Sequence, residues 1–159
     1  MAEAAGERVT GPERVAAAAR ALGLAVDVVR MPASTRTAEE AALACGCTVA
    51  QIVKSLVFEA GDGGLRLLLV SGANRVDPVA VEAATGERLS RADPKRVRAE
   101  TGFAIGGVPP VGHPAPVLMD RDLLAHATVW AAAGAPDAVF EIAPDALRAA
   151  TGATVIAMG

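Results

Sequence analysis

The spacing of hydrophobic and polar residues predicts alternating helix and strand in the first part of the chain. The alanine-rich segment at residues 12–22 favours a helix, and Gly23 suits its left-handed end. The apolar, β-branched run at residues 24–31 predicts a first strand. Thr37 begins a Thr-Ala-Glu-Glu sequence, a capping box that predicts a second helix ending at Gly46.

A hairpin and further short elements are predicted in the rest of the chain. Apolar runs at residues 52–59 and 65–71 flank the turn sequence Gly-Asp-Gly-Gly, which is typical of a β-hairpin. Asp-Pro pairs at residues 77–78 and 93–94 each provide a helix cap followed by a first-turn proline. The remaining predicted elements are strands at 116–120, 128–133, 138–143 and 154–158 and a helix at 144–151.

This order of elements mixes hairpins with scattered helices and lacks the regular alternation of a parallel α/β protein. It predicts an α+β fold, with a mixed, mainly antiparallel sheet and helices packed around it. With 159 residues, the chain is expected to form one domain over residues 1–159, of which residues 1–23 provide an N-terminal helix.

Composition and charge limit the classes of partner. No apolar run reaches the ~20 residues of a membrane-spanning helix, and acidic residues in the first fifteen positions argue against an export signal, so a cytoplasmic protein is expected. The net charge of −3 provides no global basic field for DNA or RNA. The two histidines and the closely spaced Cys45 and Cys47 predict no metal site.

One stretch, residues 88–98, concentrates five basic residues and is a local candidate for contact with RNA. A run of this kind is more often a solvated helix face. Aromatic residues make up only 3% of the chain, with one tryptophan and no tyrosine, which disfavours binding of nucleic acid by base stacking.

Lys54 is the most informative residue because it interrupts an apolar strand in a chain that has only one other lysine. By alternation it shares a face of the strand with Leu56 and Phe58, while Ser55 points to the other face. Either Lys54 extends its ammonium into water from an edge strand, or the ammonium has a task in a pocket.

A second candidate is the loop at residues 102–113, which contains Gly106, Gly107, Pro109 and Pro110 and ends at His113. Paired glycines allow a backbone to approach a ligand closely, and the prolines restrict the loop. Taken alone, such a loop is weak evidence, because plain surface turns have the same composition.

These features occur together in an order that resembles the YbaK/ProX family, the free-standing relatives of the editing insertion of bacterial prolyl-tRNA synthetase. The resemblance extends from about residue 24 to the last strand. Four segments carry it, namely IVKSLVF, SGANRVD, GFAIGGVPPVGH and FEIAPDAL. It implies hydrolysis of mischarged tRNA, most often proline tRNA carrying cysteine, alanine or another small amino acid, without a metal or organic cofactor.

The resemblance also implies roles for individual residues. Lys54 takes the place of the family's functional lysine, and Ser55 that of its polar neighbour. The backbone of the loop at Gly106 and Gly107 is implied to hold the aminoacyl ester together with Lys54. The other implied or candidate substrate contacts are Met31, Asn74, Pro109, Pro110 and His113. Met31 stands where some relatives have a tyrosine, so the hydrogen bond of that tyrosine is absent here.

Two alternatives remain at this stage. A non-catalytic module of the same fold would bind tRNA or a synthetase without hydrolysing the ester. An oligonucleotide-binding protein would use the basic stretch at residues 88–98, against which the acidic balance and the scarcity of aromatics argue. The sequence leaves open which amino acid is removed, whether water or a substrate thiol attacks, the oligomeric state, and whether prolyl-tRNA synthetase is a partner.

Overall fold

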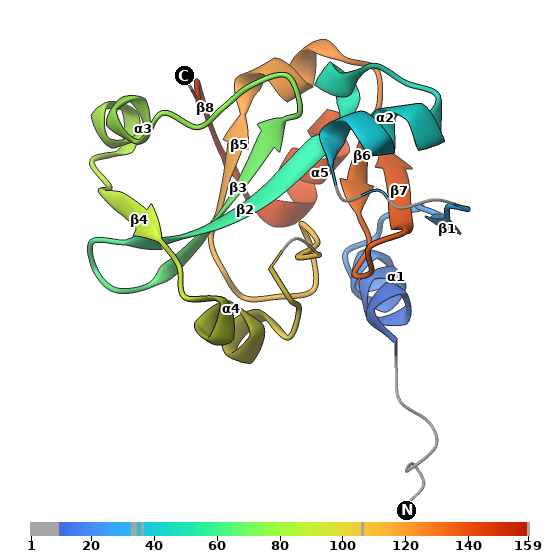
Figure 1. Ribbon diagram of the computed structural model, residues 1–159, viewed down its shortest axis with the longest axis horizontal. Coiled ribbons are helices and arrows are strands. Elements are labelled where there is room, and N and C mark those ends of the chain that lie inside the picture. The colour runs from blue at the N-terminus through green and yellow to red at the C-terminus, as the bar shows by residue number, and fades with distance from the viewer. Residues whose placement is uncertain (1–9, 33–34, 36, 106, 159) are drawn as a thin grey trace, which may run out of the picture.

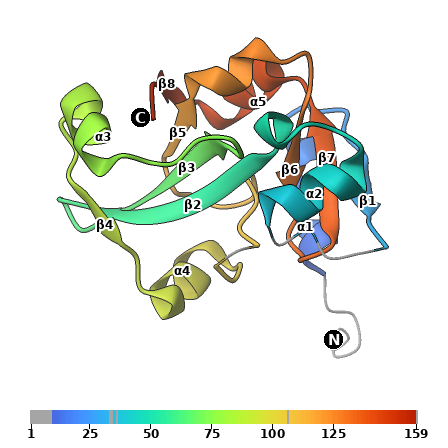
Figure 2. The same cartoon turned by 45° about the horizontal axis from the view of Figure 1, so that its top comes forward.

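The computed structural model describes residues 10–32, 35, 37–105 and 107–158. Short helices surround strands of different lengths (Figures 1 and 2). The helices are α1 (Gly11–Ala21), α2 (Ala38–Cys45), α3 (Pro78–Thr85), α4 (Pro94–Thr101) and α5 (Pro144–Thr151), with 3-10 turns η2 (Val49–Gln51) and η3 (Arg121–Ala125). The strands are β1 (Val28–Arg30), β2 (Val53–Ala60), β3 (Leu65–Ser71), β4 (Leu89–Arg91), β5 (Val117–Asp120), β6 (Val129–Ala132), β7 (Ala138–Ile142) and β8 (Thr154–Ile156).

Local capping signals explain where the helices begin and end. At α2 the Thr37 hydroxyl accepts a hydrogen bond from the Glu40 backbone N–H at 3.0 Å, and Gly46 ends the helix in the left-handed region with φ 68°. Asp77 and Asp93 cap α3 and α4 by accepting hydrogen bonds from backbone N–H groups two residues further on. No helix in the described part is long and apolar enough to cross a membrane.

The strands form two sheets. One has the order β4-β2-β3-β5-β8, in which β2 is antiparallel to β3 and β4 whereas β5 is parallel to β3 and β8. The other has the order β1-β7-β6 and is wholly antiparallel. An isolated parallel bridge between Ile52 and Trp130 links them. The expected α+β fold with mixed, mainly antiparallel pairing is confirmed, with two sheets in place of one.

Two local predictions need correction, and one turn was missed. The first strand covers only Val28–Arg30, because its pairing with β7 extends over those three residues alone. The basic stretch at residues 88–98 is not a single helix face, since it contains β4 as well as the first part of α4. The turn η3 was not predicted, and its start is fixed by the Asp120 side chain, which accepts a hydrogen bond from the Asp122 N–H.

Alternation along β2 separates its two faces, as predicted. Val53 and Val57 pack into the main core around Phe140, whereas Leu56 and Phe58 pack against a second cluster that contains Val81 of α3. Both faces of β2 are therefore covered.

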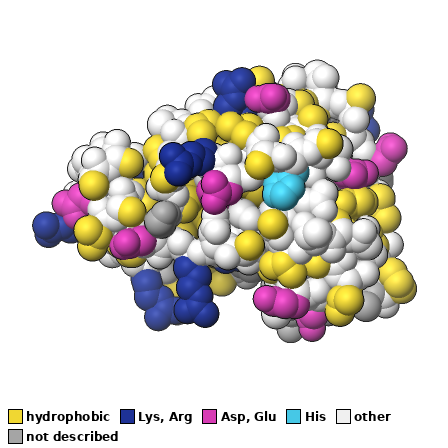
Figure 3. Space-filling model, turned by 90° about the horizontal axis from the view of Figure 1, so that it is seen from above, with side chains coloured by type: hydrophobic (Ala, Val, Ile, Leu, Met, Phe, Trp, Pro, Cys, Tyr) yellow, Lys and Arg dark blue, Asp and Glu magenta, His cyan; other side chains and the backbone are white. Residues whose placement is uncertain are grey.

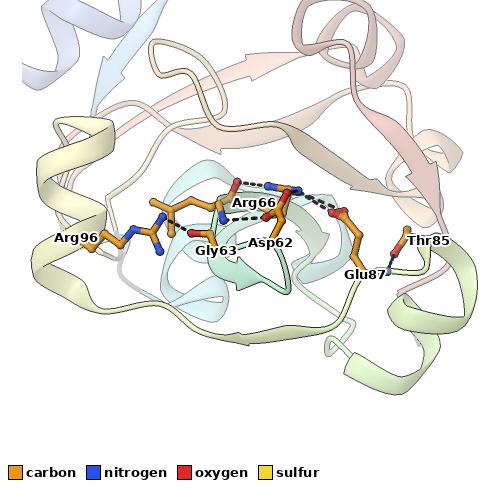
Figure 4. A network of polar contacts seen from close by, with 8 residues as sticks. Asp62, Gly63, Arg66, Thr85, Glu87 and Arg96 are labelled. Carbon is orange, nitrogen blue, oxygen red and sulfur yellow. Dashed lines mark hydrogen bonds and ion pairs between the residues drawn. The ribbon is translucent and has the colours of Figure 1, made fainter.

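At the turn of the β2–β3 hairpin, charged side chains are paired (Figure 4). Arg66 contacts Glu87 at 2.7 Å and Asp62 at 2.8 Å. Arg96 of α4 contacts Glu59 at 2.9 Å and also pairs with Glu100 in its own helix. These pairs join the hairpin to α4 and to the segment that follows α3.

Candidate active site

A cavity of about 230 Å³ lies between the first half of β2, the start of α2 and the β6–β7 hairpin. Its walls are mostly apolar, and the polar residues among them are Thr35, Thr37, Lys54 and Ser55. The apolar part includes Val108, which belongs to the loop that follows α4. The structure therefore brings together two segments that the sequence marked separately.

Lys54 lies half-buried in this cavity and its Nζ donates a hydrogen bond to the backbone carbonyl of Asn74. Burial lowers the pKa of Lys54, and the nearby Arg75 lowers it further, while Glu39 and Asp120 act in the opposite direction. No carboxylate of the described residues forms an ion pair with this ammonium. Since an ammonium has three N–H donors, Lys54 has capacity for a ligand.

Two features of Ser55 concern the site: its hydroxyl and its peptide groups. Its Oγ is buried and has no hydrogen-bond partner among the described residues. The bonds from Ala60 N–H to the Gly64 carbonyl (2.8 Å) and from Gly72 N–H to the Ile52 carbonyl (2.7 Å) show that even-numbered residues of β2 bond to β3. The peptide groups of Ser55 therefore face the other edge, where β4 pairs with β2 only over residues 58–60.

Asn74 reaches Lys54 through its backbone and not through its side chain. The Asn74 amide donates to Asp120 at 2.9 Å and to Asp122 at 2.8 Å. Asp120, only 1% exposed, also accepts the Ser71 N–H at 3.0 Å, so one buried carboxylate holds the segment that follows β3. The predicted contact of Asn74 with substrate stays a prediction, while its carbonyl is placed to orient Lys54.

The loop at residues 102–113 divides its residues between two places. Val108 lines the Lys54 cavity, whereas Gly107 lines a neighbouring cavity and its N–H donates to the Ala104 carbonyl at 2.9 Å. Pro109 and Pro110 are buried. Gly106 lies outside the described residues. In this conformation the Gly107 N–H is occupied by a turn, so its predicted bond to an ester needs a change in that turn.

His113 binds within its own loop. Its Nδ1 accepts a hydrogen bond from the Ala115 N–H at 3.2 Å, so Nε2 carries the proton and donates to the Pro109 carbonyl at 2.9 Å. Burial lowers the pKa of His113, which favours this neutral form. Neither His113 nor Met31, whose N–H donates to the Asp137 carbonyl at 2.7 Å, lines the Lys54 cavity.

Several residues of the cavity carry no signal in the sequence. Thr35, Trp130 and Val139 line it, yet they lie on three segments that are far apart along the chain. The Ile52–Trp130 bridge brings Trp130 to β2. Only long-range pairing of this kind reveals these positions, because their local sequence is that of ordinary strand or loop.

The other groups to consider are potential metal ligands and the two thiols. No group of three or more His, Cys, Asp or Glu residues in the described ranges is arranged to hold a metal ion. Burial, with Cys47 and Glu141 nearby, raises the pKa of Cys45 to about 11, and burial also raises the pKa of Cys47. Both thiols are therefore protonated at neutral pH and are poor nucleophiles.

Comparison with known proteins places this geometry in a family. The sequence profile of the aminoacyl-tRNA editing domain matches residues 32–150. The uncharacterized protein YwhH of Bacillus subtilis (strain 168) is 31% identical over 123 residues, which cover 76% of this chain and 78% of YwhH.

Solved structures agree with this result. A crystal structure of a proposed trans-editing enzyme for prolyl-tRNA synthetase is 50% identical, with a TM-score of 0.88 over 93% of this chain and 96% of that one. A structure from work on epitope backbone grafting onto scaffold proteins is 48% identical, with a TM-score of 0.87 over the same shares of the two chains. The chain belongs to the aminoacyl-tRNA editing domain family.

Proposed function

We propose that this protein is a deacylase that acts in trans on mischarged tRNA, with proline tRNA carrying cysteine, alanine or another small amino acid as its substrate. The observation that carries the proposal is the cavity of about 230 Å³ in which Lys54 has no carboxylate partner among the described residues. Membership of the editing domain family and the likeness to a proposed trans-editing enzyme support it. The site belongs to one domain that spans residues 1–159 and works in the cytoplasm.

The chemistry needs little from the protein because an aminoacyl ester is already activated. The Lys54 ammonium donates to the ester carbonyl and stabilises the negative charge that develops on its oxygen. Water, oriented by the hydroxyl of the terminal ribose, attacks the carbonyl carbon. The bond from this carbon to the ribose oxygen breaks, the ribose oxygen takes up a proton, and the amino acid leaves as its carboxylate. With a cysteine substrate, the thiol of the amino acid attacks its own ester carbonyl in place of water. The bond to the ribose oxygen breaks, this oxygen takes up the thiol proton, and the amino acid leaves as a cyclic thioester that water then hydrolyses to cysteine.

The other polar groups hold the substrate. The Asn74 carbonyl orients the ammonium, and the Ser55 hydroxyl, which lacks a partner in the described residues, binds the aminoacyl group. The apolar wall, which includes Val108 and Trp130, limits the size of the amino acid and excludes water from the ester. The loop backbone at Gly106 and Gly107 contacts the terminal ribose once the turn at Gly107 opens.

A deacylation assay with purified protein tests the proposal. Proline tRNA charged in turn with alanine, cysteine, serine, threonine and proline is incubated with wild-type protein and with a Lys54→Ala variant, in the presence and absence of a strong chelator. We expect wild-type protein to release at least one small amino acid much faster than proline, and chelation to have no effect. Restoration by zinc of a reaction that chelation had stopped would replace this mechanism with a metal-dependent one.

The same assay separates catalysis from binding alone. A non-catalytic module of this fold would retain charged tRNA in a binding assay and release no amino acid from any member of the panel. That result would overturn the proposed deacylase and would leave a role in binding tRNA or a synthetase.

A further inference from the structure

A second cavity, of about 570 Å³, lies beside the Lys54 cavity. It is formed by the start of α1, the segment after α4 at residues 102–105 and 107, and the β6–β7 turn. Ala135 and Pro136 of that turn line both cavities, so one wall separates the two. These three segments lie on the same side of the molecule as α4 (Figure 1).

Two arginines supply the charge of the second cavity. Arg14 of α1 is half-buried, with its guanidinium carbon 4.3 Å from the centre of the Phe103 ring and its Nη1 donating to the Gly102 carbonyl at 3.0 Å. Arg98 of α4 is exposed. Neither forms an ion pair within the described ranges, which distinguishes them from Arg66 and Arg96. Arg14 is thus held in place and still has donors for an anion.

The charged surface continues from this cavity onto α4. A third, open depression shares Arg98 and Ile105 with the second cavity and adds Lys95. Lys95 and Arg98 lie three residues apart and therefore share one face of α4. By contrast, the face of the molecule drawn in Figure 3 shows basic side chains in separate small groups interspersed with acidic ones.

We propose that Arg14 and Arg98 form a phosphodiester-binding track that takes the single-stranded 3′ end of tRNA from α4 to the Lys54 cavity. The proposal rests on the proposed function and adds the path of the substrate to it. The reacting ester sits at the end of a strand whose preceding nucleotides each carry a phosphate. The two guanidiniums, which form no ion pair with any described residue, line the cavity on the other side of the shared wall. Bidentate guanidinium contacts suit phosphate oxygens, and exposed Ile105 offers apolar surface to a base.

Binding of an uncharged RNA oligonucleotide with a single-stranded CCA end tests the track without reference to catalysis. Its affinity is measured at several salt concentrations for wild-type protein, Arg14→Ala, Arg98→Ala and the double variant. We expect each single change to weaken binding by roughly 3–10-fold and to reduce the slope of log K against log salt by about 0.7, the value for one phosphate contact to a single strand. Arg20→Ala is the matched control, because Arg20 is an exposed arginine at the other end of α1 and lines neither cavity.

Kinetics locate the track relative to the reaction. With charged tRNA, Arg14→Ala and Arg98→Ala should raise KM at least fivefold, and the loss of kcat/KM should exceed any loss with an aminoacyl-adenosine, which has no upstream phosphate. Arg14→Lys should recover part of the binding because it restores the charge. Thermal unfolding shows whether loss of the contact between Arg14 and Phe103 has disturbed the fold of the Arg14 variants. Arg98 is exposed, so Arg98→Ala tests the track without this complication.

The outcomes separate the track from the proposed function. If the double variant binds the oligonucleotide with wild-type affinity and salt slope, the track is wrong, even if the wild type hydrolyses charged tRNA. If wild-type protein binds the oligonucleotide through Arg14 and Arg98 but hydrolyses no ester of the panel, the track stands and the deacylase proposal falls.

Discussion

The two ends of the β2–β3 hairpin differ in whether their polar groups are paired. At the turn, Arg66 contacts the carboxylates of Asp62 and Glu87 (Figure 4). Arg96 contacts the carboxylates of Glu59 and Glu100. At the other end, the one hydrogen-bond acceptor of Lys54 among the described residues is the neutral carbonyl of Asn74, and the buried Ser55 Oγ has no described partner. One strand therefore carries a region in which charge is paired and a region in which it is not.

This difference separates stability from function. At the turn, the charged groups that pair with one another contribute to folding, and little of their hydrogen-bonding capacity remains for a ligand. Polar groups in an apolar cavity that lack partners reduce stability, because burial removes their hydration without replacing it. Such groups gain their partners when substrate binds. The comparison predicts that changes at the two ends have opposite effects on activity and on the free energy of unfolding.

Removal of the Lys54 ammonium should give the largest effect. Lys54→Ala and Lys54→Met are each expected to lower kcat for deacylation by about 10²–10³-fold, the usual cost of losing a donor to a developing oxyanion. Lys54→Met should leave the free energy of unfolding unchanged or raise it, because burial lowers the pKa of Lys54 and so disfavours its charged form. Single-turnover kinetics and urea unfolding measure the two quantities.

Lys54→Arg sharpens this test, since it keeps the charge while replacing a compact ammonium with a planar fork. It should be nearly as inactive as Lys54→Ala. Activity of Lys54→Ala within fivefold of wild type, in protein with an unchanged unfolding curve, would contradict the role of Lys54.

At the opposite end of the hairpin, Arg66→Ala should lower the free energy of unfolding by about 1–3 kcal/mol, because Glu87 and Asp62 both lose a partner that is largely shielded from water. Its kcat should stay within about twofold of wild type, since Arg66 lines neither the Lys54 cavity nor the second cavity beside it. Urea unfolding and deacylation kinetics on the same preparation check both statements. A loss of activity in Arg66→Ala without a loss of stability would contradict the assignment of stability to the turn and of function to the other end.

The sequence predicts the fold better than the site because most fold signals are local. Thr37 with its capping box, the Asp-Pro caps and the glycine turn of the hairpin each act within a few residues. The predicted first strand is longer than the observed β1, because the length of β1 depends on its pairing with β7.

The site depends on contacts between distant segments, so only part of it is visible in the sequence. Lys54 could be singled out because an apolar strand surrounds it, whereas Trp130 and Thr35 join the cavity only through the folded arrangement. The backbone contact of Asn74 with Lys54 is likewise invisible, because nothing in a residue's type indicates where its carbonyl points. Likewise, Arg14 could not be distinguished in the sequence from any other arginine of an amphipathic helix.

A smaller effect is expected from Ser55→Ala. The change should lower kcat/KM by about tenfold, equal to about 1.4 kcal/mol, if the Ser55 hydroxyl binds the aminoacyl group. Because Oγ has no partner in the described residues, its removal should leave the free energy of unfolding unchanged or slightly raised. Ser90→Ala is the matched control, because Ser90 of β4 is exposed. A destabilised Ser55→Ala with normal kinetics would assign the hydroxyl to folding.

The smallest effect concerns the electrostatic environment of Lys54, and the chain is well suited to its measurement because Lys54 and Lys95 are its only lysines. In protein with isotopically labelled lysine side chains, Lys95→Arg leaves a single lysine signal for NMR titration. That signal should titrate below the ordinary range for lysine, because burial lowers the pKa of Lys54 and the neighbouring Arg75 lowers it further. Arg75→Gln removes one of these two causes, so the titration should move to higher pH, and less so at high salt, where the charge of exposed Arg75 is screened. Arg88→Gln, which removes an exposed charge that does not act on Lys54, should leave the curve in place. A Lys54 signal within the ordinary lysine range would mean that the cavity is well hydrated, and the contrast between the two ends of the hairpin would then be one of ion pairing alone.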